Sequence, residues 1–343
     1  MSLSERYSRQ ELFEGIGKEG QQKLSSSTVL IVGCGALGSL QIETLARAGV
    51  GKLKIVDRDF VEASNLQRQV MYDEQDATLQ LPKAIAAAER VKKINSSIEI
   101  EPFVTDLSYK NVETLAESVD LVLDATDNFE TRYLINDTCV KHFKPWIYGA
   151  AVASQGLSMT IIPEKTPCLR CVFETAPPPG SSPTCDTSGV IFPIIAMVVA
   201  LQTTEAIKLL LGRTDLLHQK LVQIDPWQTS FTKLNLAGLR ERTDCRCCKQ
   251  KRFDYLEPEQ KQLSSTLCGR NSVQISPAEH TKLSLAELAD RLKSIGEVSF
   301  NRFLLRFKTT NCEMTIFPDA RTIIHNTKDE NLARSLYARY VGV

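Results

Sequence analysis

The chain has 343 residues, which at roughly 150 residues per domain allows about two domains. Lysine and arginine together number 41, and so do aspartate and glutamate, so the formal net charge is zero. This balance excludes a protein that binds nucleic acid or a membrane surface through bulk charge. With 43% hydrophobic and 24% charged residues, the composition is typical of a globular protein and excludes a disordered one.

The start of the chain and its longest apolar run favour a cytoplasmic protein. The first 20 residues are polar and charged, without the apolar core of a secretory signal. The run 190–201 is shorter than the roughly 20 residues of a membrane span. We expect it to lie in a buried helix over 193–211, ended by Gly212. We therefore expect no membrane partner and no nucleic-acid partner.

A strand, a glycine-rich loop, a helix and a second strand follow one another in the first 60 residues. Residues 27–33 form an apolar, β-branched run that ends in glycine, as buried parallel strands do. An amphipathic segment then extends to Ala48, and 52–57 is a second apolar run. This order predicts a βαβ unit.

The same alternation continues to about residue 150. Helices are expected over 82–94 and 128–142, and strands over 97–104, 119–124 and 145–149. It predicts an α/β fold, Rossmann-like, with a doubly wound, mostly parallel sheet.

Beyond Gly156 the chain becomes richer in strands. We expect strands over 157–162, 220–224 and 230–236, which would form an antiparallel extension of the sheet.

The sequence divides into a large domain over 1–248, a charged linker over 249–265 and a small α+β module over 266–343. Strands are expected in the module at 303–307, 313–317 and 322–325. Two capping-box patterns, Ser284-Leu-Ala-Glu287 and Thr327-Lys-Asp-Glu330, predict the starts of its two helices.

The glycine loop between the first strand and helix is a candidate nucleotide site. Gly33, Gly35 and Gly38 allow a tight turn and a close approach of the backbone to a polyphosphate. Asp57 follows 19 residues after Gly38, where a carboxylate can accept hydrogen bonds from ribose hydroxyls. This pattern predicts nucleotide binding, but it does not separate NAD from ATP.

Charged and polar residues follow the second strand. Asp59, Asn65 and Arg68 come soon after it, and Lys83 follows a short helix later. Cations beside a glycine loop suit the oxygens of a triphosphate. A solvated charged loop explains them equally well.

The stretch Asp124-Ala-Thr-Asp127-Asn128 directly follows an apolar strand. An acid at the carboxyl end of a parallel strand can hold magnesium against phosphate oxygens. Asp127 could instead cap the next helix.

These motifs occur together and in order with two C-x-x-C pairs, and the chain resembles the ThiF/MoeB/HesA family, the bacterial relatives of ubiquitin-activating enzymes. The resemblance covers roughly residues 4–248, and the tail resembles an extension on some ThiF/MoeB-type proteins of Gram-positive bacteria. The segments that carry it are Arg6-Tyr-Ser-Arg9-Gln10, Gly33-Cys-Gly-Ala-Leu-Gly38, Asp57-Arg-Asp59, Ser64-Asn65-Leu-Gln-Arg68-Gln69, Leu81-Pro-Lys83 and Asp124-Ala-Thr-Asp127-Asn128.

The resemblance implies ATP-dependent adenylation of the C-terminal glycine of a ubiquitin-like sulfur carrier, ThiS or MoaD, with release of pyrophosphate. Such carriers end in Gly-Gly and serve thiamin or molybdenum cofactor biosynthesis. The sulfur would come from a donor such as a cysteine desulfurase.

The resemblance also implies roles for individual residues. Asp57 would bind the ribose, Asp127 would hold Mg²⁺, and Arg9 would reach the site of a second copy across a homodimer interface. The residues that would contact the phosphates are Asn65, Arg68 and Lys83. The other cofactor-binding residues are Gly33, Gly35, Gly38, Asp59 and Asn128.

Ten cysteines in a chain without a secretory signal favour thiol or metal chemistry over a disulfide scaffold. By the resemblance, Cys168, Cys171, Cys245 and Cys248 form a structural zinc site. Cys247 offers a third thiolate in the second pair, and the C-x-x-C spacing favours 245 with 248. Cys185 follows a loop rich in proline and glycine and could take part in sulfur transfer.

Two other function classes remain open at this point. The glycine loop with Asp57 also fits an NAD-dependent oxidoreductase, which would not need the paired cysteines. A non-catalytic scaffold that binds a ubiquitin-like protein would need a broken active site. The choice between a ThiS-like and a MoaD-like carrier is also open.

Overall fold

The computed structural model describes residues 3–177, 185–257, 264–267, 272–277 and 282–342. The chain forms two compact units. The first comprises residues 1–178 and 188–257, and the second comprises 179–187 and 258–343.

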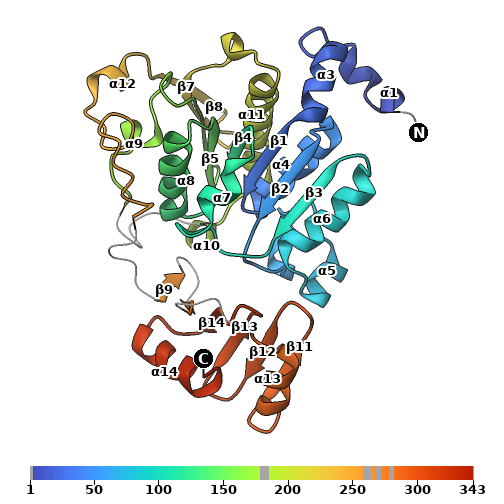
Figure 1. The fold of residues 1–343 in the computed structure, drawn as a ribbon, viewed down its shortest axis with the longest axis vertical. Helices are drawn as coiled ribbons and strands as arrows, with labels where there is room; N and C mark the ends of the chain where they lie inside the picture. The colour runs from blue at the N-terminus through green and yellow to red at the C-terminus, as the bar shows by residue number, and fades with distance from the viewer. Residues whose placement is uncertain (1–2, 178–184, 258–263, 268–271, 278–281, 343) are drawn as a thin grey trace. The chain divides into compact units, whose positions relative to one another are not determined.

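An eight-stranded sheet in the order β3-β2-β1-β4-β5-β6-β7-β8 is the centre of the first unit (Figure 1). Strands β3, β2, β1, β4 and β5 are parallel, and β5 to β8 are antiparallel neighbours. The strands are β1 (Thr28–Val32), β2 (Lys52–Val56), β3 (Glu99–Phe103), β4 (Leu121–Asp124), β5 (Trp146–Val152), β6 (Gln155–Ile161), β7 (Lys220–Asp225) and β8 (Ser230–Asn235).

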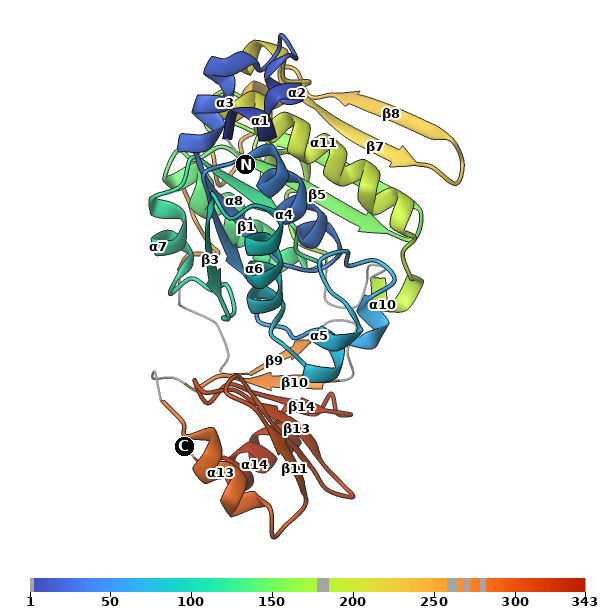
Figure 2. The same ribbon diagram turned by 90° about the vertical axis from the view of Figure 1, so that its right-hand side faces the viewer.

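Helices cover both faces of this sheet, which gives two separate apolar cores (Figures 1 and 2). One core packs α3, α4, α6 and α11 on the sheet, and the other packs α7, α8 and α9. The helices of this unit are α1 (Leu3–Arg6), α2 (Ser8–Glu11), α3 (Gly17–Ser26), α4 (Ala36–Ala48), η1 (Ala63–Asn65), α5 (Glu74–Leu79), α6 (Lys83–Ile94), α7 (Val112–Glu117), α8 (Phe129–Lys141), α9 (Leu169–Val172), α11 (Phe192–Leu210), η2 (Thr214–Leu216) and α12 (Leu239–Arg242). A four-residue helix, α10 (Cys185–Ser188), precedes α11.

Helix α11 contains the apolar run that the sequence placed in a buried helix. By length and composition alone it would suit a membrane span, and 44% of its most apolar window is buried. Its buried face packs on β4 to β7. Gln202 Nε2 on this face donates to the carbonyls of Asp124 (2.9 Å) and Ile147 (3.2 Å). The helix is therefore fastened to the sheet by polar bonds inside an apolar contact.

The second unit contains a six-stranded antiparallel sheet in the order β11-β12-β13-β14-β10-β9. Two helices cover one face of it, where Phe307 and Tyr340 pack with ring centroids 4.9 Å apart. Its elements are β9 (Ser264–Leu267), β10 (Ser272–Ile275), α13 (Leu285–Leu292), β11 (Glu297–Phe300), β12 (Leu305–Lys308), β13 (Glu313–Ile316), β14 (Thr322–His325) and α14 (Glu330–Tyr340).

The predicted fold class is confirmed: a doubly wound, mostly parallel sheet carries an antiparallel extension and is joined to a small α+β unit. We expected residues 249–257 to belong to a linker. They belong instead to the first unit and pack on it. Asp254 pairs with Arg170 (2.9 Å), and the ring of Tyr255 stacks on Tyr133 at 5.0 Å.

One predicted helix cap is wrong. Ser284 caps α13 as expected, but α14 begins two residues later than the Thr327 pattern indicates. Asp329 is the N-cap and accepts hydrogen bonds from the backbone of Asn331 (2.8 Å) and Leu332 (3.1 Å). Its carboxylate also interacts favourably with the positive end of the helix dipole, which a threonine hydroxyl does much less.

We expect Asp329→Ala to weaken the first turn of α14 by about 1 kcal/mol, because two backbone N–H groups lose their acceptor. Hydrogen exchange at Asn331 and Leu332 should become faster. Thr327→Ala, the matched control, should leave these two amides almost unchanged. Equal effects of the two substitutions would show that Asp329 is not the cap.

Candidate functional site

The carboxyl ends of three adjacent strands form the centre of the candidate site. Strand β1 pairs in parallel with β2 on one side and β4 on the other. The chain leaves β1 toward β2 and returns later to β4, so the sheet order reverses beside β1. In open α/β sheets, ligands bind outside the strand ends at such a reversal. Gly33, Asp57 and Asp124 all lie there.

Two of the three glycines in the loop after β1 are required by the protein's own packing. Gly33 has φ of +96°, and an added Cβ would lie 2.7 Å from the Ala125 carbonyl oxygen. At Gly38, in the first turn of α4, an added Cβ would lie 1.9 Å from the carbonyl oxygen of Gly33. These positions bring the strand end, the helix and the loop after β4 into direct contact.

Asp57 holds this loop in place from the end of β2. One carboxylate oxygen accepts the backbone N–H of Cys34 at 2.6 Å, and the other accepts that of Asp59 at 2.7 Å. Burial raises the pKa of Asp57, while the positive charge of Lys83 opposes the rise. Each oxygen keeps a further acceptor direction, so the carboxylate can also bind hydroxyl groups of a ligand.

Tyr72 and Lys83 also contact the residues around the glycine loop. The buried Tyr72 hydroxyl donates to the Cys34 carbonyl at 2.6 Å and lies 3.3 Å from the Lys83 carbonyl. Lys83 begins α6, is only 4% exposed, and has its ammonium 3.5 Å from a carboxylate oxygen of Asp59. The structure therefore brings Lys83, Asp59 and the glycine loop together, as the sequence predicts for a phosphate site.

Arg58 belongs to the site although the sequence analysis gave it no role. Its guanidinium lies 3.1 Å from Asp106. Burial lowers the pKa of Arg58, but four carboxylates around it give a net rise. They are Asp106, Asp59, Asp127 and Asp57. In the sequence, Arg58 lies between two acidic residues at the end of a predicted strand, Asp57 and Asp59, and this position could have indicated that it belongs to the site.

The polar residues of the loop after β4 have different roles. Asp124 is fully buried, accepts the Thr126 N–H at 2.9 Å and lies 3.3 Å from the Arg132 guanidinium. Asn128 is the N-cap of α8, where its side chain accepts the Thr131 N–H at 2.9 Å. Asp127 is exposed and accepts no hydrogen bond within the described part of the chain. It is therefore the carboxylate of this loop that can hold a cation.

The segment from η1 carries Asn65, Arg68 and Gln69, and of these three side chains Gln69 lies beside the glycine loop. Asn65 is 3% exposed and accepts the Glu62 N–H at 3.2 Å, so it shapes the turn. Arg68 donates to the Ser64 carbonyl at 2.8 Å. Gln69 is buried, with its amide nitrogen beside Gly35.

Arg9 does not lie with the other site residues of its own chain. Its segment is anchored by Gln10, which donates to the Ala48 carbonyl at the C-terminal end of α4 (2.9 Å). The glycine loop is at the N-terminal end of that helix of 13 residues, about 20 Å away. Arg9 is exposed and has no hydrogen bond or ion pair among the described residues.

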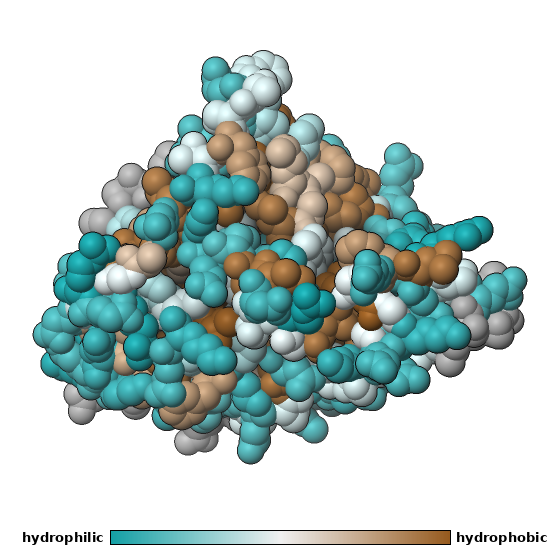
Figure 3. Space-filling model, turned by 90° about the horizontal axis from the view of Figure 1, so that it is seen from above, coloured by the Kyte–Doolittle hydropathy of each residue, from teal (hydrophilic) through white to brown (hydrophobic). Residues whose placement is uncertain are grey.

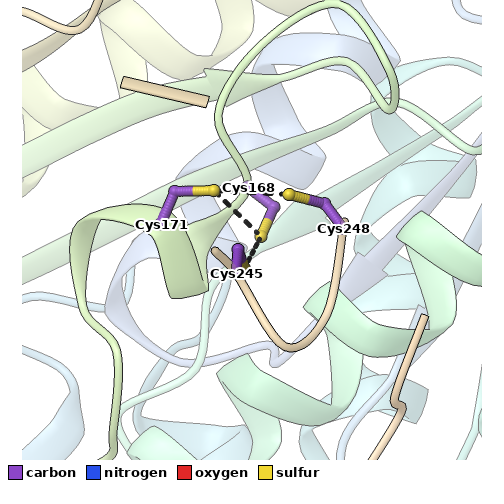
Figure 4. A group of neighbouring side chains, drawn as sticks. All are labelled: Cys168, Cys171, Cys245 and Cys248. Atoms are coloured by element: carbon purple, nitrogen blue, oxygen red, sulfur yellow. Dashed lines mark hydrogen bonds between the residues drawn. The ribbon is translucent and has the colours of Figure 1, made fainter. Parts of the chain in front are cut away.

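Four cysteine side chains from two distant segments point toward one another (Figure 4). Sulfur–sulfur distances are 3.8 Å for Cys168–Cys171, 3.5 Å for Cys168–Cys245 and 3.4 Å for Cys171–Cys248. All exceed the roughly 2 Å of a disulfide. Four sulfurs at about 2.3 Å from one zinc ion would lie about 3.8 Å apart. The cluster can therefore hold zinc.

The other cysteines whose side chains the structure describes, Cys34, Cys139, Cys247 and Cys312, are buried. Cys247 accepts a hydrogen bond from the Asn136 amide at 3.3 Å and lies outside the group of four. Burial raises the pKa of Cys34, Cys139 and Cys312, which suits packing residues rather than nucleophiles. Cys185 begins α10, but its side chain lies outside the described residues.

Two curated relatives match most of this chain. A protein of Bacillus subtilis named sulfur carrier protein ThiS adenylyltransferase is 41% identical over 341 residues, which is 99% of this chain and 100% of that protein. The sulfur carrier protein adenylyltransferase of Thermus thermophilus is 38% identical over 264 residues, covering 76% of this chain and 93% of its own.

A solved structure and a family match agree with this similarity. The crystal structure of E. coli MccB with ATP shares the fold, with a TM-score of 0.59 at 24% identity over 71% of this chain and 73% of that chain. The ThiF family matches residues 7–247, which contain the glycine loop, the residues around it and three of the four clustered cysteines. The chain therefore belongs to the ThiF family.

Proposed function

We propose that this protein uses ATP to adenylate the C-terminal glycine of a small sulfur carrier protein and releases pyrophosphate. The observation that carries the proposal is the 41% identity to the ThiS adenylyltransferase of B. subtilis along essentially the whole of both chains. The same match favours a ThiS-like carrier and thiamin biosynthesis over a MoaD-like carrier. The comparisons support neither an oxidoreductase nor a non-catalytic scaffold.

The arrangement of charges suits this reaction. The attacking carboxylate is already ionised at pH 7, so the enzyme needs no general base. It must instead stabilise the charge on the α-phosphoryl group and on the departing pyrophosphate. Lys83 and Arg68 would be the cations that do this, together with the first N–H groups of α4, which have no side-chain cap. Asp57 would bind the ribose.

Asp127 would hold the magnesium ion that accompanies ATP. It is exposed at the carboxyl end of β4, whereas Asp124 is engaged with Arg132 and Asn128 caps α8. A magnesium ion bound there would neutralise phosphate charge.

The cysteine cluster would hold a structural zinc ion. Its four sulfurs lie within 4.8 Å of one another, and Cys168, Cys245 and Cys248 are buried. A closed site with four cysteine ligands leaves no open position for chemistry, so the ion would join the two C-x-x-C segments.

We also propose a homodimer in which Arg9 completes the site of the other copy. Arg9 is about 20 Å from its own glycine loop, too far for an arginine side chain. Figure 3 shows brown, apolar areas on the face of the molecule that it draws. The exposed apolar side chains of the first unit include Leu12 (73% exposed) and Phe13 (65%), close to Arg9 in the sequence, and Met197 (39%) on α11. Exposed apolar groups of this kind mark interfaces.

Sulfur transfer would follow adenylation. Cys185 stays the candidate thiol for that step, and a cysteine desulfurase the candidate sulfur donor.

We expect ATP–pyrophosphate exchange that depends on a carrier ending in Gly-Gly. Asp127→Asn should lower the exchange rate by roughly 100-fold or more, because charge on the phosphates is then less well stabilised. Glu117→Gln, which makes the same change at an exposed position on α7, should leave exchange unchanged. Near-normal exchange by Asp127→Asn would remove Asp127 from the site.

The same assay tests the carrier. A ThiS-like carrier should support exchange, and the same carrier without its last two glycines should not. Exchange with a MoaD-like carrier alone would contradict the proposed pathway.

The purified protein should contain about one zinc ion per chain. Cys171→Ser and Cys248→Ser should lose it, whereas Cys247→Ser should keep it because that thiol is bonded to Asn136. Removal by a chelator should lower the stability of the fold by several kcal/mol, roughly, since binding the ion and folding are coupled. Zinc loss in Cys247→Ser with retention in Cys248→Ser would reverse the ligand assignment.

A mixed dimer tests Arg9. Arg9→Ala and Asp127→Asn homodimers should both be inactive. A heterodimer of the two, purified through two different tags, contains one intact site, so about half of the wild-type rate should return. A heterodimer without activity would place the action of Arg9 within its own chain and contradict the proposal.

A further inference from the structure

The Gln69 side chain is buried and has no hydrogen-bond partner among the described residues. It is 3% exposed, and its carbonyl oxygen Oε1 is buried and unpaired. Its amide nitrogen Nε2 also donates to no atom among the residues that the structure describes.

Such a group is unusual in a folded protein. Buried side-chain polar atoms are bonded in the large majority of cases, and an unpaired one weakens the fold. A glutamine that only filled space would be less costly as leucine or methionine. The free donor, Nε2, therefore suggests a ligand that accepts a hydrogen bond from it, whereas Oε1 would need a donor.

Gly35 independently indicates space for a ligand at the same place. Gly33 and Gly38 are glycines because a Cβ would collide with backbone atoms of this chain. Gly35 differs from both, because no backbone atom of the described chain would meet a Cβ there. An added Cβ would meet only Gln69 Nε2, at 3.9 Å. The space next to the Gly35 Cα is therefore open and is bordered by the Gln69 amide nitrogen.

The electrostatics of this space favour an anion. Gly35 is the N-cap of α4, and no side chain caps that helix. Its first N–H groups and the positive end of its dipole therefore attract negative charge. The amide nitrogen of Gln69 adds a further donor at that end, and a phosphate oxygen is an acceptor that both can share.

We propose that Gln69 is a nucleotide-contacting residue, whose Nε2 donates to a phosphate oxygen of ATP in the space left open by Gly35. This inference rests on the proposed function, since it takes the nucleotide of that reaction as the ligand. Gln69 thereby adds to Arg68 and Lys83 a neutral donor at the N-terminus of α4.

Gln69→Met tests the contact because methionine has a similar length and no amide. ATP binding, measured by calorimetry with wild-type and variant protein, should weaken about tenfold or more. The melting temperature without ATP should stay unchanged or rise, because an unpaired buried amide is removed. A purely structural glutamine would give the opposite pair of results: a lower melting temperature and unchanged ATP affinity.

Two glycine substitutions give a matched comparison. Gly35→Ala should weaken ATP binding, because its methyl group enters the ligand space and meets no backbone atom of this chain. Gly38→Ala should lower that melting temperature, since its methyl group would collide with the Gly33 carbonyl.

The outcomes separate this inference from the proposed function. If the wild-type protein binds no ATP, both fail. If the wild type binds ATP and Gln69→Met binds it equally well, only the assignment of Gln69 is overturned. Tight ATP binding by Gly35→Ala would likewise show that the phosphates lie elsewhere.

Discussion

The nucleotide site depends on the register of three parallel strands, which places their carboxyl ends side by side. Val32 at the end of β1 pairs with Val56 of β2 and with Asp124 of β4. The three loops that follow therefore start at the same height, on either side of the point where the sheet order reverses. Backbone bonds close this edge, from Gly33 N–H to the Val56 carbonyl (2.8 Å) and from Ala125 N–H to that of Val32 (2.9 Å).

Asp57 shows how one residue serves both the fold and the site. Both of its oxygens accept backbone N–H groups, so the carboxylate is held in one orientation before any ligand arrives. Its burial removes water from around the charge, and the nearby Lys83 compensates in part. A carboxylate fixed in this way need not reorganise to accept hydrogen bonds from a ligand, which is the advantage of a preorganised site.

Local patterns in the sequence predicted the elements of the large unit closely. The apolar strands and the helices at 83–94 and 129–141 lie within a few residues of their predicted ranges, because hydrophobic periodicity reports burial directly. Pairings between distant residues could not be predicted in this way. Examples are the ion pair of Asp124 with Arg132 and the packing of Asp254 on Arg170.

The sequence also could not show which of several similar, neighbouring side chains takes a given structural role. Asp127 and Asn128 are adjacent, and either can cap a helix, but only the backbone path shows that Asn128 does. Asp329 replaced Thr327 as a cap for the same reason. Among three thiols in Cys245-Arg-Cys247-Cys248, the partner that engages Cys247 is Asn136, more than 100 residues away. Spacing in the sequence carries no information about that bond.

Helix α8 connects the cysteine cluster to the nucleotide site. Its N-cap, Asn128, directly follows Asp127, while Asn136 lies two turns along the helix. The Asn136 side chain accepts the Leu169 N–H beside Cys168 (2.9 Å) and donates to Cys247 (3.3 Å), so it fastens both C-x-x-C segments to α8. A metal ion that locks these segments together would also fix the helix that positions Asp127. The cluster can thus help to position Asp127 through α8 without contacting a substrate.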